Sequence, residues 1–221
     1  MKSVLFDYGG TLDADGSTWL ERFRPIYKEF GIDVPDARFD RAFYDSDDGL
    51  PARYALDGLD LLQTLRLQVR DVLEALAPER VDLTDRIAGR FAADSRASFA
   101  RLRPTLERLS KRYRLGIVSN FYGNLDGILR AEGLLPLFDV VADSGVLGVL
   151  KPDPEIFLHA ARALESEPGD CVMVGDSVKR DMKGAAAAGM KKALVCAART
   201  APDAGQDWTV RSVVELEKSL G

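Results

Sequence analysis

The 221-residue sequence predicts an α/β fold in which a parallel sheet is interrupted, after its first strand, by an α-helical insertion. Short apolar runs with the length of a buried strand recur along the chain. In the second half, helical patterns separate these runs, and such alternation is typical of a parallel sheet covered on both faces. Between residues 14 and 104 no buried-strand pattern occurs, and apolar residues recur at helical spacing.

The individual elements follow from these patterns in chain order. We expect strands at SVLFDY (3–8), LGIVSN (115–120), FDVVADS (138–144), CVMVGD (171–176) and KALVC (192–196). We expect helices at STWLERFRPIYKEFG (17–31), GLDLLQTLRLQVRDVLEAL (58–76), DPEIFLHAARALESE (153–167) and SVKRDMKGAAAAGM (177–190). The predicted core therefore comprises residues 1–13 and 105–221, and the predicted insertion comprises residues 14–104.

Composition and charge exclude several classes of protein. The formal net charge of −5 argues against non-specific nucleic-acid binding, which requires a basic surface. The sequence contains no run of about 18 apolar residues that could span a membrane. The first expected strand begins directly after Met1 and leaves no room for a signal peptide. We therefore expect a cytoplasmic protein that binds neither nucleic acid nor membrane.

Polar side chains stand where the expected strands end. Asp7 follows the first apolar run, Ser119 and Asn120 close the second, and Asp176 closes a later one. The carboxyl ends of parallel strands lie along one edge of a sheet, where ligands bind in open α/β folds. These side chains are therefore expected to converge on a shared crevice.

Four segments resemble the motifs of the haloacid dehalogenase (HAD) superfamily. They are FDYGGTL (6–12), VSN (118–120), LKPDPEIF (150–157) and VMVGDSVKRDMKGAAAAGM (172–190). The resemblance covers the full chain, and the helical block after the first motif is similar to the branch with an α-helical cap (subfamily IA-like). It implies a Rossmann-like core, an aspartate nucleophile and, for most members, Mg²⁺-dependent phosphoryl transfer to water from a small phosphorylated substrate.

On this basis Asp7 is expected to attack phosphorus and to form an aspartyl-phosphate, which divides one difficult step into two. The repulsion between this carboxylate and a phosphate dianion must be offset. Mg²⁺ held by Asp7 and Asp176 can offset it, together with a backbone carbonyl that the resemblance places at Gly9. Asp181 is expected either to bind the metal directly or to hold a metal-bound water.

The remaining site residues are expected to contact the transferring phosphoryl group. Lys151 would supply positive charge to its oxygens and to Asp7. Ser119 and the backbone around Asn120 would donate hydrogen bonds to the same oxygens. The turn residues Gly10 and Thr11 are also expected at the phosphate site, with Thr11 stabilising the turn. Asp7, Ser119 and Lys151 form the predicted catalytic set.

Gly9 is the main departure from the family pattern. Phosphatases of the superfamily usually carry a second aspartate at this position, which protonates the leaving group and then activates water. One interpretation is a slow phosphatase in which Asp13 or Asp15 partly substitutes. Alternatively, Asp13 and Asp15 are helix N-caps before STWLERF.

Three further hypotheses follow from the missing acid. A metal-independent dehalogenase also works without it, but such enzymes carry asparagine where this chain has Asp176. A phosphonate-type hydrolase uses a lysine of its cap, and Lys28 is the only lysine between residues 14 and 104. A phosphate-binding regulatory module with little turnover is the third.

Overall fold

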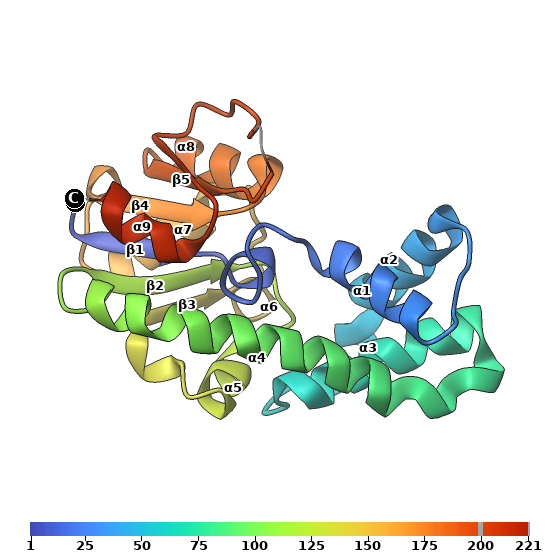
Figure 1. Cartoon of the computed structure of the whole chain (residues 1–221). Coiled ribbons are helices and arrows are strands. Elements are labelled where there is room, and N and C mark those ends of the chain that lie inside the picture. Colours follow the sequence, from blue (N-terminus) through green and yellow to red (C-terminus); the bar gives the residue numbers. More distant parts are fainter. Residues whose placement is uncertain (199–200, 221) are drawn as a thin grey trace.

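The computed structural model describes residues 1–198 and 201–220 and contains one parallel sheet in the order β3-β2-β1-β4-β5-β6 (Figure 1). The strands are β1 (Ser3–Phe6), β2 (Arg114–Ser119), β3 (Val140–Asp143), β4 (Cys171–Gly175), β5 (Lys191–Val195) and β6 (Trp208–Val210). Every strand predicted from the sequence is present, and all pairings are parallel. The α/β fold class is therefore confirmed.

Two local elements differ from the expectation. Strand β6 was not predicted, because three residues at the sheet edge are too few to give a buried-strand pattern. The expected helix at 177–190 is instead a wide turn at Val178–Met182 followed by the short helix α8 (Lys183–Ala187). The helix ends before Gly189, whose φ of 77° reverses the chain in the way that glycine permits.

The strands send alternate side chains to opposite faces of the sheet. In β1, Val4 and Phe6 pack into one hydrophobic cluster, and Leu5 packs into the other. The first cluster is completed by α4 (Thr84–Leu109), α5 (Leu125–Ala131) and α9 (Val213–Ser219), and the second by α7 (Pro154–Ala163) and α8. Both faces are covered, so the central strands are buried and hold their carboxyl ends in fixed positions.

The helical insertion lies beyond the carboxyl ends of the strands (Figure 1). It comprises α1 (Trp19–Glu29), α2 (Asp36–Arg53), α3 (Leu61–Leu76), a 3₁₀ turn at Pro78–Leu83 and most of α4. Its interior is aromatic, since Phe23 stacks on Phe91 with 4.1 Å between ring centroids and Tyr27 packs edge-on against Phe39. These rings belong to the same hydrophobic cluster as Val4 and Phe6 of β1, so the insertion is packed continuously with the core next to the sheet edge.

Helix α4 belongs to both parts of the molecule. It packs against α3 in the insertion and against α9 in the core. The predicted boundary between residues 104 and 105 falls inside this continuous helix, and the division into two domains stays a prediction. The remaining short helices are α6 (Ser144–Leu147) and the 3₁₀ turns Leu135–Leu137 and Pro168–Asp170. Across residues 1–198 and 201–220, no helix combines the length and the apolarity needed to cross a membrane.

The burial of β2 leads to a stability prediction. Ile117 is fully buried in the central part of the sheet, so Ile117→Ala leaves a cavity and should lower the free energy of unfolding by about 2–5 kcal/mol. Val146→Ala is the control, because Val146 is 70% exposed and should change stability by less than about 0.5 kcal/mol. Urea unfolding followed by circular dichroism measures both, and equal effects would contradict the assigned core.

Candidate active site

The carboxyl ends of β1, β2 and β4 bring three polar side chains together. β1 lies between β2 and β4, and Phe6 pairs in register with Ile117 and with Val174. The next positions along the chain are Asp7 after β1 and Asp176 just beyond β4, while Ser119 ends β2. The chain crosses from one side of β1 to the other at this point, which is where open α/β sheets bind ligands.

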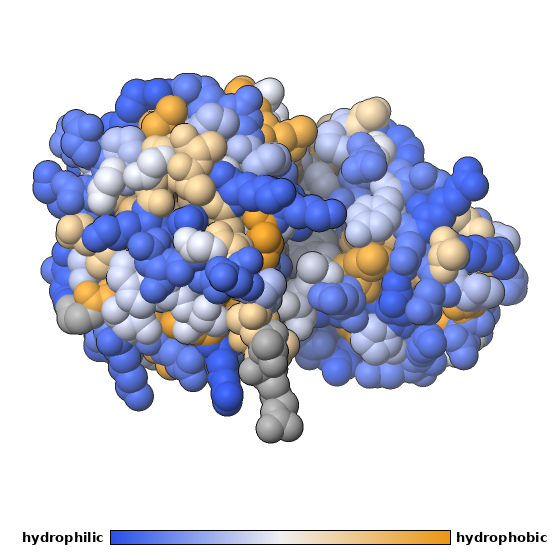
Figure 2. Space-filling view, turned by 90° about the horizontal axis from the view of Figure 1, so that it is seen from above, coloured by the Kyte–Doolittle hydropathy of each residue, from blue (hydrophilic) through white to orange (hydrophobic). Residues whose placement is uncertain are grey.

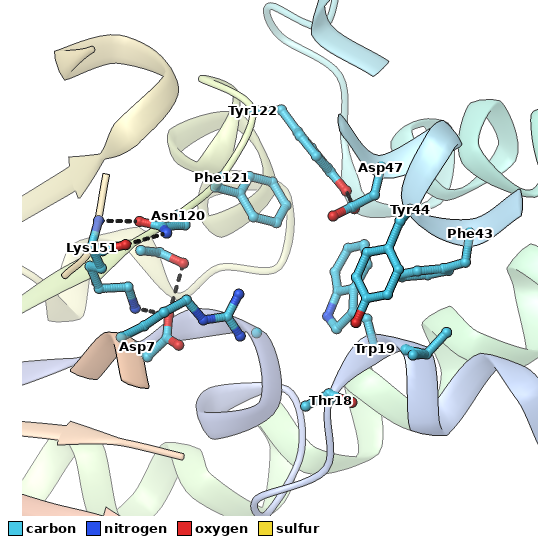
Figure 3. Close-up of a pocket in the computed structure, with 14 residues that line it drawn as sticks. Asp7, Thr18, Trp19, Phe43, Tyr44, Asp47, Asn120, Phe121, Tyr122 and Lys151 are labelled. Carbon is cyan, nitrogen blue, oxygen red and sulfur yellow. Dashed lines mark hydrogen bonds and ion pairs between the residues drawn. The ribbon is translucent and has the colours of Figure 1, made fainter. Parts of the chain in front are cut away.

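Asp7 is held through one of its two carboxylate oxygens (Figure 3). Its Oδ1 accepts hydrogen bonds from the Tyr8 backbone N–H at 2.7 Å and the Ser119 hydroxyl at 2.9 Å, and it lies 2.8 Å from the Lys151 ammonium. Among the described residues no contact is made to Oδ2, although the side chain lines a pocket. The carboxylate is therefore fixed in direction with one oxygen available.

Lys151 is a buried cation between two carboxylates. Its Nζ lies 2.8 Å from Asp7 Oδ1 and 2.7 Å from Asp181 Oδ1, and the residue is 4% exposed. Burial lowers the pKa of Lys151, but the charges of Asp181 and Asp7 outweigh it and raise the pKa above its usual value. The lysine is therefore positively charged at neutral pH.

Asn120 positions this lysine through its backbone. The Lys151 N–H donates to Asn120 Oδ1 at 2.7 Å, and Asn120 Nδ2 donates to the Lys151 carbonyl at 3.1 Å. The amide side chain therefore already has two partners. Any hydrogen bond from Asn120 to a phosphate would come from its backbone, as the sequence analysis expected.

Asp7, Asp176 and Asp181 form a compact acidic cluster. Each offers an oxygen, and these oxygens all lie within 4.8 Å of one another. Burial, with the neighbouring charges of Asp7 and Asp181, raises the pKa of Asp176 to about 7. Burial also raises the pKa of Asp181, against the opposing charge of Lys151. The oxygen-only donor set suits Mg²⁺, and a divalent cation would relieve the repulsion among these carboxylates.

The oxygens of the cluster are not equally free. Asp181 accepts from Lys151 through Oδ1 and from the Ser177 backbone N–H through Oδ2 at 2.9 Å. Asp176 accepts the Thr11 hydroxyl on Oδ1 at 2.9 Å, and no contact within the described chain involves its Oδ2. Asp7 and Asp176 therefore fit direct binding of a cation better than Asp181 does.

Glycines allow the chain to close around this cluster. Gly10 has a φ of 85°, and a Cβ there would lie 2.7 Å from Asp176 Oδ2. A Cβ on Gly175 would lie 2.4 Å from Asp181 Cγ. Gly10 and Thr11 therefore both lie against Asp176 of the acidic cluster. The sequence predicted them at the phosphate site, whereas this position is that of residues which support a metal site. A phosphate-binding role for these two residues stays a prediction.

A pocket of about 730 Å³, open to solvent, adjoins Asp7 between the sheet edge and helices α1 and α2. Figure 2 shows the surface narrowing between the two parts of the molecule. Residues of both parts line the pocket: Asp7, Gly9, Thr18, Trp19, Leu20, Phe43, Tyr44, Asp47, Ser119, Asn120, Phe121, Tyr122, Lys151 and Arg180.

Sequence reasoning missed two charged residues of this pocket. Asp47 lies on α2, where it accepts hydrogen bonds from the Tyr122 hydroxyl and, at 3.1 Å, from Gln68 Nε2. Nothing in the local pattern YDSDDG distinguishes it from its acidic neighbours. Arg180 directly precedes Asp181 in the fourth motif. Its position next to an expected metal ligand could have indicated that it lies at the site.

Asp13 and Asp15 are neither pocket residues nor helix caps. Thr18 is the N-cap of α1, so the expectation that these aspartates cap the helix is wrong. Asp13 is buried and accepts from the Gly10 N–H and from Trp19 Nε1, both at 2.7 Å, and it forms an ion pair with Arg22. Asp13 therefore ties the turn after β1 to α1.

Asp15 forms an ion pair with Arg101 on α4. Neither it nor Asp13 lines the pocket, and both carboxylates are already bound to arginines. The geometry therefore gives no support to either as a substitute for the acid missing at Gly9.

The chain belongs to the haloacid dehalogenase-like hydrolase family. The family model matches residues 1–189. The assignment to the branch with an α-helical cap stays a prediction, although the position of the insertion after β1 agrees with it.

Curated relatives match over shorter segments. The chain is 45% identical over 92 residues to the bovine (Bos taurus) haloacid dehalogenase-like hydrolase domain-containing protein 3, which covers 41% of this chain and 37% of the relative. It is 44% identical over 54 residues to the N-acylneuraminate-9-phosphatase of Rattus norvegicus, covering 24% of this chain and 22% of that protein. It is 38% identical over 90 residues to the glyceraldehyde 3-phosphate phosphatase of Methanopyrus kandleri, covering 39% and 38%. Each alignment thus spans well under half of the relative.

Solved structures match over the full chain. A HAD phosphatase from Thermococcus onnurineus is 28% identical with a TM-score of 0.60, covering 100% of this chain and 98% of that one. A 2-haloacid dehalogenase from Pseudomonas syringae pv. Tomato is 25% identical with a TM-score of 0.57, covering 100% and 98%. The fold is therefore shared with proteins named for two different reactions.

The acidic cluster leads to a metal-binding prediction. Asp176→Asn should weaken Mg²⁺ binding by more than about tenfold, because it removes the charge of one of the three clustered carboxylates. Isothermal titration calorimetry with MgCl₂ measures the change. Asp126→Asn is the control, since Asp126 is exposed on α5, outside the cluster. Equal Mg²⁺ affinity in the wild type and the Asp176 variant would contradict this assignment.

Proposed function

We propose that the protein is a Mg²⁺-dependent phosphatase that hydrolyses a small phosphorylated metabolite through an aspartyl-phosphate on Asp7. One observation carries the proposal. Asp7 lies at a pocket with one carboxylate oxygen bound by three donors and the other uncommitted, beside a buried lysine and two further carboxylates. We also propose that the helical insertion acts as the cap of this site and that the protein works in the cytoplasm.

In the first step a carboxylate oxygen of Asp7 forms a bond to phosphorus, the bond between phosphorus and the leaving oxygen breaks, and the departing alkoxide takes a proton from water. The three donors on Oδ1 fix the orientation of the carboxylate, so little rotational freedom remains to be lost on reaching the transition state. The Lys151 ammonium, which is held in place, stabilises negative charge on Asp7 and on the phosphoryl oxygens. The Ser119 hydroxyl can donate to a phosphoryl oxygen once substrate is bound.

Mg²⁺ would be held by Asp7, Asp176 and the Gly9 carbonyl, with Asp181 supporting it through a water. When bound, the cation would offset the repulsion between the Asp7 carboxylate and the phosphate dianion. In the second step water attacks phosphorus, releases phosphate and restores Asp7. Asp181 also keeps Lys151 in place, because its Oδ1 lies 2.7 Å from the ammonium.

The absence of a carboxylate at Gly9 determines which esters react fast. Gly9 has no side chain that could protonate a departing alkoxide, and general acid help is typically worth about 10²–10⁴ in rate. Esters with acidic leaving groups need no such help. We therefore expect fast turnover only for esters of acidic alcohols or for substrates that supply their own stabilisation.

The alternatives receive less support from the site. A metal-independent dehalogenase has no use for the clustered carboxylates of Asp176 and Asp181. A phosphonate-type mechanism needs a lysine in the pocket, but Lys28 forms an ion pair with Asp33 and does not line the pocket. The names of the rat and archaeal relatives, which are phosphatases, agree with the proposal.

The proposed nucleophile is tested by Asp7→Asn. This variant keeps the shape of the side chain but removes the attacking charge, so hydrolysis of p-nitrophenyl phosphate should fall by more than about 10³-fold. The release of p-nitrophenol with and without MgCl₂ measures this. Metal-independent chloride release from a 2-haloacid would favour the dehalogenase. Tight phosphate binding without turnover would favour a regulatory module.

The missing acid is tested by restoring it. Gly9 has a φ of −73°, and a Cβ there would lie 3.4 Å from Trp19 Nε1, so Gly9→Asp fits the turn without strain. The variant should raise kcat for alkyl phosphates by about 10²-fold while changing p-nitrophenyl phosphate turnover far less. Gly9→Asn, which has the same size but cannot donate a carboxylic proton, is the matched control. An equal gain with both substrates would argue against a missing proton donor.

A further inference from the structure

Asp47 is a half-buried carboxylate that makes no direct ion pair within the described residues. Its two hydrogen bonds, from the Tyr122 hydroxyl and Gln68 Nε2, both go to Oδ1. No hydrogen bond from the described part of the chain reaches its Oδ2, and the residue lines the pocket next to Asp7. A buried charge is costly unless something pairs with it, so this oxygen is suited to a ligand.

Aromatic rings surround the same part of the pocket. Phe121 packs against Tyr122 with 4.7 Å between centroids and against Trp19 with 5.8 Å, which joins rings of the core and the insertion into one wall. Tyr44 is 50% exposed although it is a large aromatic residue. The rings of Trp19, Phe43, Tyr44, Phe121 and Tyr122 all line the pocket (Figure 3). Aromatic faces attract organic cations.

The core side and the insertion side of the pocket carry different charged residues. Lys151 and Asp7 lie on the core side, whereas Asp47 and Tyr44 lie on the opposite side, on the insertion (Figure 3). Arg180, from the core, also lines the pocket; its side chain makes no hydrogen bond or ion pair within the described residues, although its positive charge acts on Asp47. Positive charge on the core wall suits a phosphate, and negative charge among aromatic rings suits a cation.

We propose that the substrate is a phosphate monoester of an amino alcohol, with its protonated or quaternary amine between Asp47 and the aromatic wall. This inference rests on the proposed phosphatase function. The phosphate would lie at Asp7 and Lys151 with Arg180 nearby, and the ammonium would supply a direct ion-pair partner for Asp47. Burial raises the pKa of the Asp47 carboxyl, and the positive charge of Arg180 opposes this rise only in part.

The test compares two esters of the same shape. Phosphocholine carries a quaternary ammonium, and 3,3-dimethylbutyl phosphate replaces its nitrogen by carbon and has no positive charge. With Mg²⁺ present, wild-type kcat/KM should be at least about tenfold higher for phosphocholine. Asp47→Asn should remove most of this preference, mainly through KM. The variant keeps an Oδ1 acceptor for Tyr122 and Gln68, so the fold should be retained.

Asp48→Asn is the matched control. It removes the same charge from the same helix at an exposed position outside the pocket, so the preference for phosphocholine should remain. Equal kcat/KM for the two esters would overturn the inference. So would a preference that survives in Asp47→Asn.

Failure of the proposed function gives a different result, because then neither ester nor p-nitrophenyl phosphate is hydrolysed in an Asp7-dependent way. Calorimetric binding of both esters to Asp7→Asn decides the inference in that case. Tighter binding of phosphocholine, lost in the double variant with Asp47→Asn, supports the cation site. Equal binding of the two esters overturns it.

Discussion

The position of the Lys151 ammonium between Asp7 and Asp181 is the constraint on which the site depends. The three side chains come from different loops, after β1, before α7 and after β4, and all are buried. Charges in such a place are tolerated only while they compensate one another, and losing one partner of a buried pair typically costs about 3–5 kcal/mol. The edge of the sheet must therefore hold the loops that carry these three residues in fixed positions relative to one another.

Two walls enclose the pocket, one formed by the core and the other by the helical insertion. The core wall is rigid, since its side chains stand at the ends of buried strands and are fixed by backbone donors. The opposite wall comes from α1 and α2, and it offers aromatic rings and a single carboxylate. Asp13 connects the two walls, because it binds both the Gly10 N–H and Arg22 of α1. The residues proposed for catalysis and those proposed for substrate recognition thus lie on separate walls that Asp13 links.

The sequence predicted the core wall better than the opposite wall, for a physical reason. Buried strands have a strong local pattern, so the sequence alone places Asp7, Ser119 and Asp176 at one edge of the sheet. Asp47 reaches the pocket through the packing of α2 against α3 and the contact with Tyr122, which local patterns do not encode. Strand β6 was missed because its stability depends on pairing with β5, not on its own three residues. The grouping of Lys151 with Asp181 is observed, whereas the catalytic roles stay predictions.

Helix α4 limits how this molecule can be recombined with its relatives. A graft that exchanges the helical insertion at residues 104 and 105 would cut an uninterrupted helix that packs against α3 of the insertion and against α9 of the core. The two halves would have to match in rotational phase as well as in sequence, because a shift of one residue turns an α-helix by about 100°. Chimeras therefore need the whole of Thr84–Leu109 from one parent. The pocket-lining helices α1 and α2 are thus inherited together with a helix that also packs against α9 of the core.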